Sequence, residues 1–204
     1  RVDAARGGGP RRTMPDGHAP QVRPARSGTC ADVAVPEWLW PELQSDHAGE
    51  AGAVEIYRGI RAVSRDPDVQ RFAERHAATE RRHLRLIEEV VPRARRSRLL
   101  PLWRLAGWLT GALPALFGPR AVYRTIAAVE TFVDGHYAAQ THQLAGLAPY
   151  RELHDLLESC RLDEVAHRDD AAQRTSGRPS LVARIWHRLV GAGSVAGVAL
   201  AKRF

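Results

Sequence analysis

Helix-forming residues dominate the chain from Pro41 onward: Ala, Leu, Arg and Glu are frequent, and the alternation of apolar and polar positions typical of strands is absent. Pro, Gly and Asp-Pro punctuation divides this region into five or six expected helices. Four long helices are expected at about 42–64, from Asp66-Pro67 to just before Pro92, from just after Gly118-Pro119 to about 144, and from near Pro149 to near 177. The pattern therefore predicts an all-α protein.

Two further segments, 101–118 and 181–204, are strongly apolar. Their longest uncharged runs are 105–119, with 15 residues, and 189–201, with 13 residues, whereas a helix that spans a membrane needs about 20. Neither segment is expected to cross a bilayer. Each is instead expected to form either a buried core helix or an interfacial helix.

The surroundings of segment 101–118 favour the interfacial alternative. Clustered Arg attracts anionic lipid headgroups, and Trp prefers the membrane interface. Both residue types are present here: Arg93, Arg95, Arg96, Arg98, Arg104, Trp103 and Trp108. The other interpretation is a core helix capped by a solvated basic loop. Two pairs with small-xxx-small spacing, Gly107/Gly111 and Gly193/Gly197, would allow close helix contacts in either case.

Composition and charge change the picture mainly at the N-terminus. The net charge is +7, but residues 1–29 hold six Arg against two Asp, so the rest of the 204-residue chain carries only +3. A nucleic-acid-binding function, which needs basic residues gathered on a folded face, is not expected. Residues 1–35, rich in Arg, Gly and Pro, are expected to be disordered, and residues 36–204 to form one domain. Cys30 and Cys160 show no CxxC spacing, which favours a reducing, cytosolic compartment.

Two Glu-x-x-His pairs carry the candidate chemistry. Glu80 and His83 belong to the sequence TERRH, and Glu164 and His167 belong to DEVAH. Residues three apart on a helix project from the same face, so each pair could hold a metal ion. One such pair alone means little, because most would be surface salt-bridge partners.

Each pair is preceded by a helix that carries a Glu among small or apolar neighbours. Glu50 lies in HAGEAGAV and Glu130 in TIAAVETFV. Glu130 follows Glu50 by 80 residues, and the second Glu-x-x-His pair follows the first by 84, which indicates a duplicated helical hairpin. Ile126, Val129 and Val133 crowd the same side as Glu130, where an unpaired carboxylate would cost several kcal/mol or take up a proton.

Four inward carboxylates repel one another, and two iron ions would neutralise them and supply the missing bonds. One Glu from each of two helices plus a Glu-x-x-His from each of two others is the ligand set of di-iron and di-manganese carboxylate bundles. Oxygen and imidazole ligands suit iron or manganese, and no thiolate cluster points to structural zinc. The alternative is a coincidence of two pairs on solvated faces. We therefore predict two iron ions bound by Glu50, Glu80, His83, Glu130, Glu164 and His167.

The remaining candidates are His and Tyr residues near these positions. His47 could hydrogen-bond a ligand from behind or could simply be solvated. His136 and Tyr137 follow Glu130 by about two turns, so one of them is expected to face a pocket beside the metals, with ordinary helix packing as the alternative. The other His residues, His76, His142 and His154, lack a matching spacing and are expected to be exposed.

The sequence resembles the demethoxyubiquinone hydroxylases, also called 3-demethoxyubiquinol 3-hydroxylases, from about Asp46 to Phe204. The resemblance rests on motifs in order: DHAGE at 46–50, IY at 56–57, ERRHL at 80–84, PLW and a Gly-rich apolar stretch at 101–118, AVE at 128–130 followed by HY at 136–137, and DEVAHRD at 163–169. The family usually has YGA where this chain has AGA at 51–53, a His where Gly135 stands, and a second His where Arg168 stands.

The resemblance implies a ferritin-like four-helix bundle with additional apolar interfacial helices, in which the same six residues bind two iron ions. It implies a di-iron monooxygenase that uses O2 to hydroxylate the ring of a polyprenyl quinol, with His136 and Tyr137 near the reacting ring. It also implies a peripheral protein on the cytoplasmic side of the cell membrane, in a homo-oligomer or a ubiquinone-biosynthesis complex. The alternatives are another ferritin-like di-iron oxidase or hydroxylase, and a non-enzymatic iron-binding or quinone-binding scaffold.

Overall fold

The computed structural model describes residues 33–175, 177–178 and 180–204. These residues form six α-helices and three short 3-10 helices, and they contain no strand, which confirms the all-α prediction. The α-helices are α1 (Trp40–Val63), α2 (Pro67–Val90), α3 (Leu100–Ala115), α4 (Pro119–Leu144), α5 (Arg151–Gln173) and α6 (Leu181–Ala201). The 3-10 helices are η2 (Glu37–Leu39), η3 (Arg93–Arg95) and η4 (Ala148–Tyr150). The expected boundaries are therefore correct to within a few residues.

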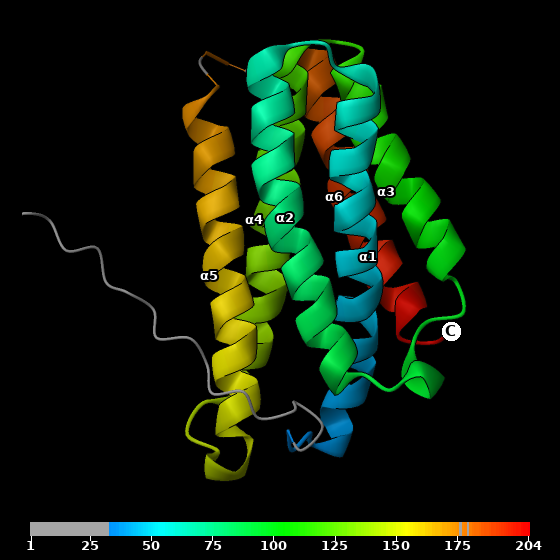
Figure 1. Ribbon diagram of the computed structural model, residues 1–204, viewed down its shortest axis with the longest axis vertical. Coiled ribbons are helices and arrows are strands. Elements are labelled where there is room, and N and C mark those ends of the chain that lie inside the picture. Colours follow the sequence, from blue (N-terminus) through cyan, green and yellow to red (C-terminus); the bar gives the residue numbers. More distant parts are fainter. Residues whose placement is uncertain (1–32, 176, 179) are drawn as a thin grey trace, which may run out of the picture.

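Four helices form the bundle, and α3 connects its two halves (Figure 1). Helices α1 and α2 run antiparallel as one hairpin, and α4 and α5 form a second antiparallel hairpin. Because α2 ends at one end of the bundle and α4 begins at the other, α3 runs the length between them along α1. One long crossover between two hairpins is the connectivity of ferritin-like bundles. The ferritin-like fold prediction is confirmed.

The Asp-Pro and Gly-Pro pairs that were expected to mark helix boundaries have these roles in the structure. The Asp66 carboxylate accepts hydrogen bonds from the backbone N–H groups of Asp68 and Val69, at 2.9 and 3.1 Å, and so caps the start of α2. Gly118 has a φ of 91°, a conformation that favours glycine, and it turns the chain from α3 into α4 at Pro119. These two positions fix where α2 and α4 begin.

The bundle core has two apolar clusters. One is built around Tyr57 and Phe72, and the other around Leu43 and Leu157. In each bundle helix the predicted metal ligands lie between residues of the first cluster and residues of the second. A polar layer therefore lies between two regions of apolar packing.

Helix α3 packs very closely on α1 through glycines. A Cβ atom added at Gly107 would collide with the backbone of Gly52, and one added at Gly111 would collide with the backbone of Ile56. The first small-residue pair thus allows the close contact that its spacing indicates. The second pair does not, because Gly193 has open space around it and Gly197 meets only the Trp103 side chain.

Replacing Gly111 by alanine is expected to destabilise the fold by about 1–3 kcal/mol, because the new methyl group must push α3 away from α1. Gly135, a helical glycine of α4 with nothing within 4 Å of an added Cβ, is the matched control. Gly135→Ala should instead stabilise the protein by about 0.5–1 kcal/mol. Urea unfolding followed by circular dichroism measures both changes, and equal effects would contradict the close α1/α3 contact.

Helices α3 and α6 expose large apolar side chains. On α6 only Ala201 is buried. The exposed residues in and beside the two helices are Leu102, Leu105, Trp108, Leu109, Leu113, Leu116, Phe117, Leu181, Val182, Ile185, Leu189, Val195, Leu200 and Phe204. Among the described residues, no helix has the length and apolar character needed to cross a membrane.

The basic residues beside α3 do not act as one solvated cluster. Arg93, Arg98 and Arg104 are exposed. Arg96 instead bonds to Glu88, at 2.9 Å, and to the carbonyl group of Val91. Arg96 therefore fastens the loop after α2 and is not part of a solvated basic loop.

The segment expected to be disordered, 1–35, lies outside the described residues except for its last three positions. Of these, Val33 and Val35 pack against the second apolar cluster.

Candidate metal centre

All six predicted ligands meet in the polar layer of the bundle. Each is at most 5% exposed, although four are acidic. They come from all four bundle helices: Glu50 from α1, Glu80 and His83 from α2, Glu130 from α4, and Glu164 and His167 from α5. The alternative of two coincidental pairs on solvated faces is therefore wrong.

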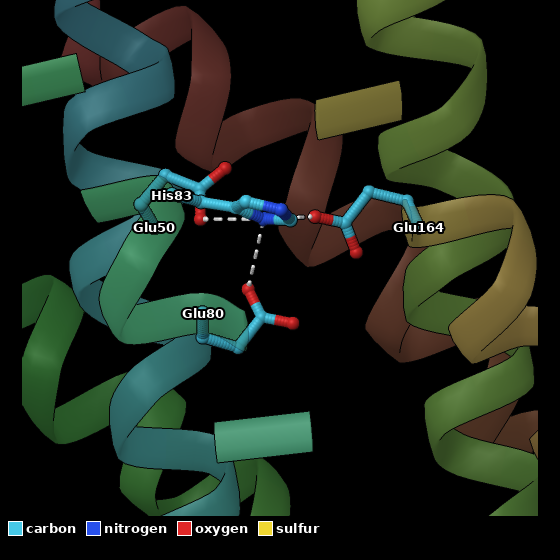
Figure 2. Close-up of side chains that lie close together, drawn as sticks. All are labelled: Glu50, Glu80, His83 and Glu164. Carbon is cyan, nitrogen blue, oxygen red and sulfur yellow. Dashed lines mark ion pairs between the residues drawn. The ribbon is translucent and has the colours of Figure 1, made fainter. Parts of the chain in front are cut away.

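The first group of ligands surrounds His83 (Figure 2). Its Nδ1 atom lies 2.9 Å from Glu164, 3.8 Å from Glu50 and 3.8 Å from Glu80. Side chains from three different helices thus point at one small volume. One ligand atom from each of these four residues lies within 4.8 Å of the others, an arrangement that could hold a metal ion. We call this group the His83 site.

The second group surrounds His167, whose Nδ1 atom lies 2.9 Å from Glu80 and 3.3 Å from Glu164. With Glu130, these residues form another set of four that could hold a metal ion. We call this group the His167 site. Glu80 and Glu164 belong to both sites, so each carboxylate could bridge two neighbouring ions.

The buried ligand atoms that lack a well-aligned hydrogen bond fit two cations. Five buried ligand atoms lack a well-aligned hydrogen bond: Oε2 of Glu50, Oε1 of Glu80, Nδ1 of His83, Oε2 of Glu164 and Nδ1 of His167. Burying polar atoms without partners costs about 1–3 kcal/mol each. Because these atoms face the same space, cations bound there would supply the missing bonds. The oxygen and imidazole donor set suits iron or manganese.

The pKa values of the predicted ligands show that positive charge is needed to balance the carboxylates of the polar layer. Burial raises the pKa of Glu50 and Glu130 well above the usual range. Burial opposes a charge on His83, but contacts with Asp163 and Glu164 outweigh it and raise the pKa of His83 to about 11. In the same way, contacts with Glu164 and Glu80 raise the pKa of His167 to about 10. Without metal, protons must neutralise the layer, and bound cations would replace them.

Two tyrosines hold the outer carboxylates in a reciprocal arrangement. Tyr137 of α4 donates a hydrogen bond to Glu50 of α1 at 2.5 Å, and Tyr57 of α1 donates one to Glu130 of α4 at 3.0 Å. Of His136 and Tyr137, one of which is expected to face a pocket beside the metals, Tyr137 contacts a predicted ligand, Glu50. Tyr57 was noted only in the IY motif, without a role, although it follows Glu50 by seven residues as Tyr137 follows Glu130.

His136 belongs to a second polar network at one side of the centre. Its Nε2 atom lies 2.9 Å from the Asp46 carboxylate and 3.3 Å from the Ser45 hydroxyl. Asp46 is buried and also accepts a hydrogen bond from Gln140 at 2.9 Å. His136 therefore does not contact a predicted ligand. The Asp46 carboxylate fixes the orientation of its ring.

The structure decides between the two alternatives for His47 and corrects the expectation for His76. His47 is buried and pairs with Glu88 at 3.4 Å rather than with a metal ligand. His76, expected to be exposed, is buried: it bonds to Asp170 at 2.9 Å, and its ring packs 4.2 Å from the ring of His167. His76 precedes Glu80 by four residues, so it lies on the ligand face of α2. His142 is exposed as expected, and His154 is half-buried.

An apolar cavity lies beside the polar layer. A cavity of about 320 Å³ lies between α1, α3, α4 and α6, and Ile56, Trp103 and Val190 are among its lining residues. A second space of about 60 Å³ is bordered by Glu50, Glu130, His136 and Tyr137, among others. The residues that line both are Ser45, Gly49, Ala53, Phe132, Val133 and Val198. The larger cavity thus adjoins the candidate metal centre.

Comparison with known proteins identifies the family of this chain. The family described as "Ubiquinone biosynthesis protein COQ7" matches residues 38–201. The chain belongs to this family. The relative from Mus musculus, named NADPH-dependent 3-demethoxyubiquinone 3-hydroxylase, mitochondrial, is 32% identical over 166 residues, covering 79% of this chain and 76% of that protein. The 3-demethoxyubiquinol 3-hydroxylase of Rhodospirillum rubrum is 38% identical over 130 residues, covering 62% of this chain and 60% of its own length.

In this member of the COQ7 family, the departures from the usual motifs lie away from the ligand atoms. Arg168, next to His167, turns outward to Asp134 at 2.7 Å. Gly135 has open space on its side-chain side. Ala51 is buried, and Gly52 lies where α3 approaches α1. All six predicted ligands are in place in the polar layer.

Proposed function

We propose that the protein is a di-iron monooxygenase that hydroxylates the ring of demethoxyubiquinol in ubiquinone biosynthesis. The observation that carries this proposal is a buried layer of four Glu and two His, arranged as two overlapping metal sites, at the end of an apolar cavity. Membership in the COQ7 family and the names of the relatives support the substrate and the reaction.

The residues present fit two iron ions. One would be held in the His83 site and the other in the His167 site, with Glu80 and Glu164 shared. Bound iron would supply activation of O2 and transfer of one oxygen atom into a ring C–H bond, while two electrons and two protons convert the other atom to water. Tyr57 and Tyr137 hold the outer carboxylates in place by hydrogen bonds.

The cavity between α1, α3, α4 and α6 would bind the substrate. Its mainly apolar walls suit a polyprenyl tail, and the small space beside the ligands would take the ring. His136 and Tyr137 border this small space, with His136 held by Asp46. We therefore assign these two residues to orienting the ring and to hydrogen bonding with its hydroxyl groups.

The structure indicates no strand–helix site for a nucleotide electron donor among the described residues. The described residues contain no strand and so no strand–helix nucleotide-binding unit. The mouse relative is named NADPH-dependent, which is said of that protein. A separate reductase or the quinone itself would deliver the electrons.

The proposal is tested by extracting quinones from a strain whose demethoxyubiquinol hydroxylase is deleted. Such a strain should accumulate demethoxyubiquinone, and expression of this chain should restore ubiquinone. If the purified protein binds two iron ions but does not restore ubiquinone, it is a di-iron oxidase with another substrate. If it restores ubiquinone without binding iron, the proposed metal chemistry is wrong.

The exposed apolar residues of α3 and α6 would attach the protein to the cytoplasmic side of the cell membrane, where a polyprenyl quinol resides. Phe117→Glu is expected to weaken binding to anionic vesicles several-fold in a sedimentation assay, because Phe117 is 81% exposed and close to these helices. Leu162→Glu is the matched control, since Leu162 is 54% exposed but lies on α5. Wild-type protein that ignores vesicles would refute the attachment.

A further inference from the structure

The two histidines of the proposed sites differ in the contact made by the ring nitrogen that faces away from the metal position. In the His83 site, the Nδ1 atom of His83 faces the carboxylates, and its Nε2 atom is 3.0 Å from the Asp163 carboxylate. Asp163 also accepts a hydrogen bond from Arg82, the residue next to His83. The imidazole is thus fixed from outside by a carboxylate that is itself held by a guanidinium group.

The His167 site lacks this support. The Nδ1 atom of His167 faces Glu80 and Glu164 in the same manner. However, no carboxylate of the described residues forms an ion pair with its other nitrogen. The ring instead packs edge-on against the ring of His76, with 4.2 Å between the centroids and 76° between the planes.

The rest of the centre is nearly symmetric. Each site has one outer carboxylate, Glu50 or Glu130, and each of these accepts a hydrogen bond from a tyrosine. Glu80 and Glu164 are common to both sites. The carboxylate behind His83 is therefore the main difference between two otherwise similar ligand sets.

We propose that the two metal positions are unequal, and that Asp163 makes the His83 site the tighter one, which takes up the first iron ion. This inference rests on the proposed di-iron function. A carboxylate that accepts the outer N–H of a ligand histidine fixes the tautomer, orients the ring and makes the metal-facing nitrogen more basic. Loss of such a partner typically costs about 10–100-fold in metal affinity. Asp163 is thus a positioning residue that acts through His83.

The chain offers a close control for a substitution at Asp163. Two helical turns away on the same pair of helices, Asp170 contacts His76 at 2.9 Å and Arg75 at 3.3 Å. This trio repeats the trio of Asp163, His83 and Arg82, but His76 is not a predicted ligand. Asp170→Asn therefore removes a similar charge from the same interface without touching a residue of the His83 site.

The experiment is an anaerobic titration of metal-free protein with ⁵⁷Fe(II), read by calorimetry and by Mössbauer spectroscopy at one equivalent. Wild-type protein and Asp170→Asn should bind iron in two resolved steps, with one spectral component dominant at one equivalent. Asp163→Asn should weaken the first step about 10–100-fold, so that both components appear together. Arg82→Gln, which leaves the Asp163 carboxylate in place, should cause a smaller loss, and circular dichroism confirms that each variant keeps its helix content.

Single-site variants assign the steps. Protein with His167→Ala should keep the tight step, and protein with His83→Ala should keep only the weak one. Two equal steps in wild-type protein, or an unchanged first step in Asp163→Asn, would overturn the inference while leaving the di-iron function intact. Failure of the wild-type protein to bind two iron ions would overturn both.

Discussion

Replacing Glu130 by alanine is expected to reduce hydroxylation by about 100-fold or more while the helical fold remains. Glu130 belongs to the proposed His167 site alone, so its loss should lower the bound iron from about two ions per chain to about one. The fold should survive because the change removes a buried carboxylate whose pKa burial raises well above the usual range. Iron analysis and quinone analysis of the complemented strain measure the two effects.

The matched control for this variant is Glu152→Ala, which removes an exposed carboxylate from α5. It should bind two iron ions and restore ubiquinone like wild-type protein. Full restoration of ubiquinone by Glu130→Ala would show that the His167 site is not needed for the reaction. Loss of helix content in circular dichroism would show that Glu130 serves folding rather than metal binding.

The clustering of the six candidate ligands could be predicted, because residues close in sequence on one helix have a known relative geometry. Residues three apart on a helix share a face whatever surrounds that helix, so Glu80 and His83 could be paired from sequence alone. The repetition of the pattern 84 residues later, at Glu164 and His167, made coincidence improbable. Helix boundaries were readable for a similar reason, since Pro, Gly and Asp caps act on the backbone next to them.

The partners behind the ligands could not be predicted, because they are set by how the helices pack. Asp163 lies beside Glu164 in sequence, but only the approach of α5 to α2 brings it to His83. His47 lies three residues before Glu50, yet packing turns it to Glu88 of α2. Two signals were nevertheless present. His76 lies on the ligand face of its helix, and Tyr57 repeats the position of Tyr137 relative to the preceding Glu.

The exposed faces of α3 and α6 show another limit of prediction from the sequence. Their apolar composition was evident, but composition does not tell which side packs inward. Gly107 and Gly111 decide this for α3, since a helix can approach α1 so closely only on its glycine side. No comparable contact buries α6, whose only buried residue is Ala201. The cavity between these helices and the bundle follows from that loose packing.

Removing the metal is expected to lower the melting temperature of the bundle. Helices α2 and α5 face each other largely through charged pairs, including His83 with Glu164 and His167 with Glu80. Metal ions bound to Glu80 and Glu164 would cross-link the two hairpins at this interface. In metal-free protein, bound protons must instead neutralise the buried carboxylates. An ion at 100 times its dissociation constant stabilises by about 2.7 kcal/mol, which is roughly 5–11 °C for a chain of this size.

Differential scanning calorimetry before and after anaerobic chelation measures this shift, and returning Fe(II) should restore the higher melting temperature. The control is Glu80→Ala, which removes a carboxylate shared by both sites and should make the melting temperature nearly insensitive to chelator. An equal shift in that variant would mean that the chelator acts elsewhere. An unchanged melting temperature in iron-loaded wild-type protein would mean that apolar packing alone holds α2 against α5, and that the ligand layer carries its charge without metal.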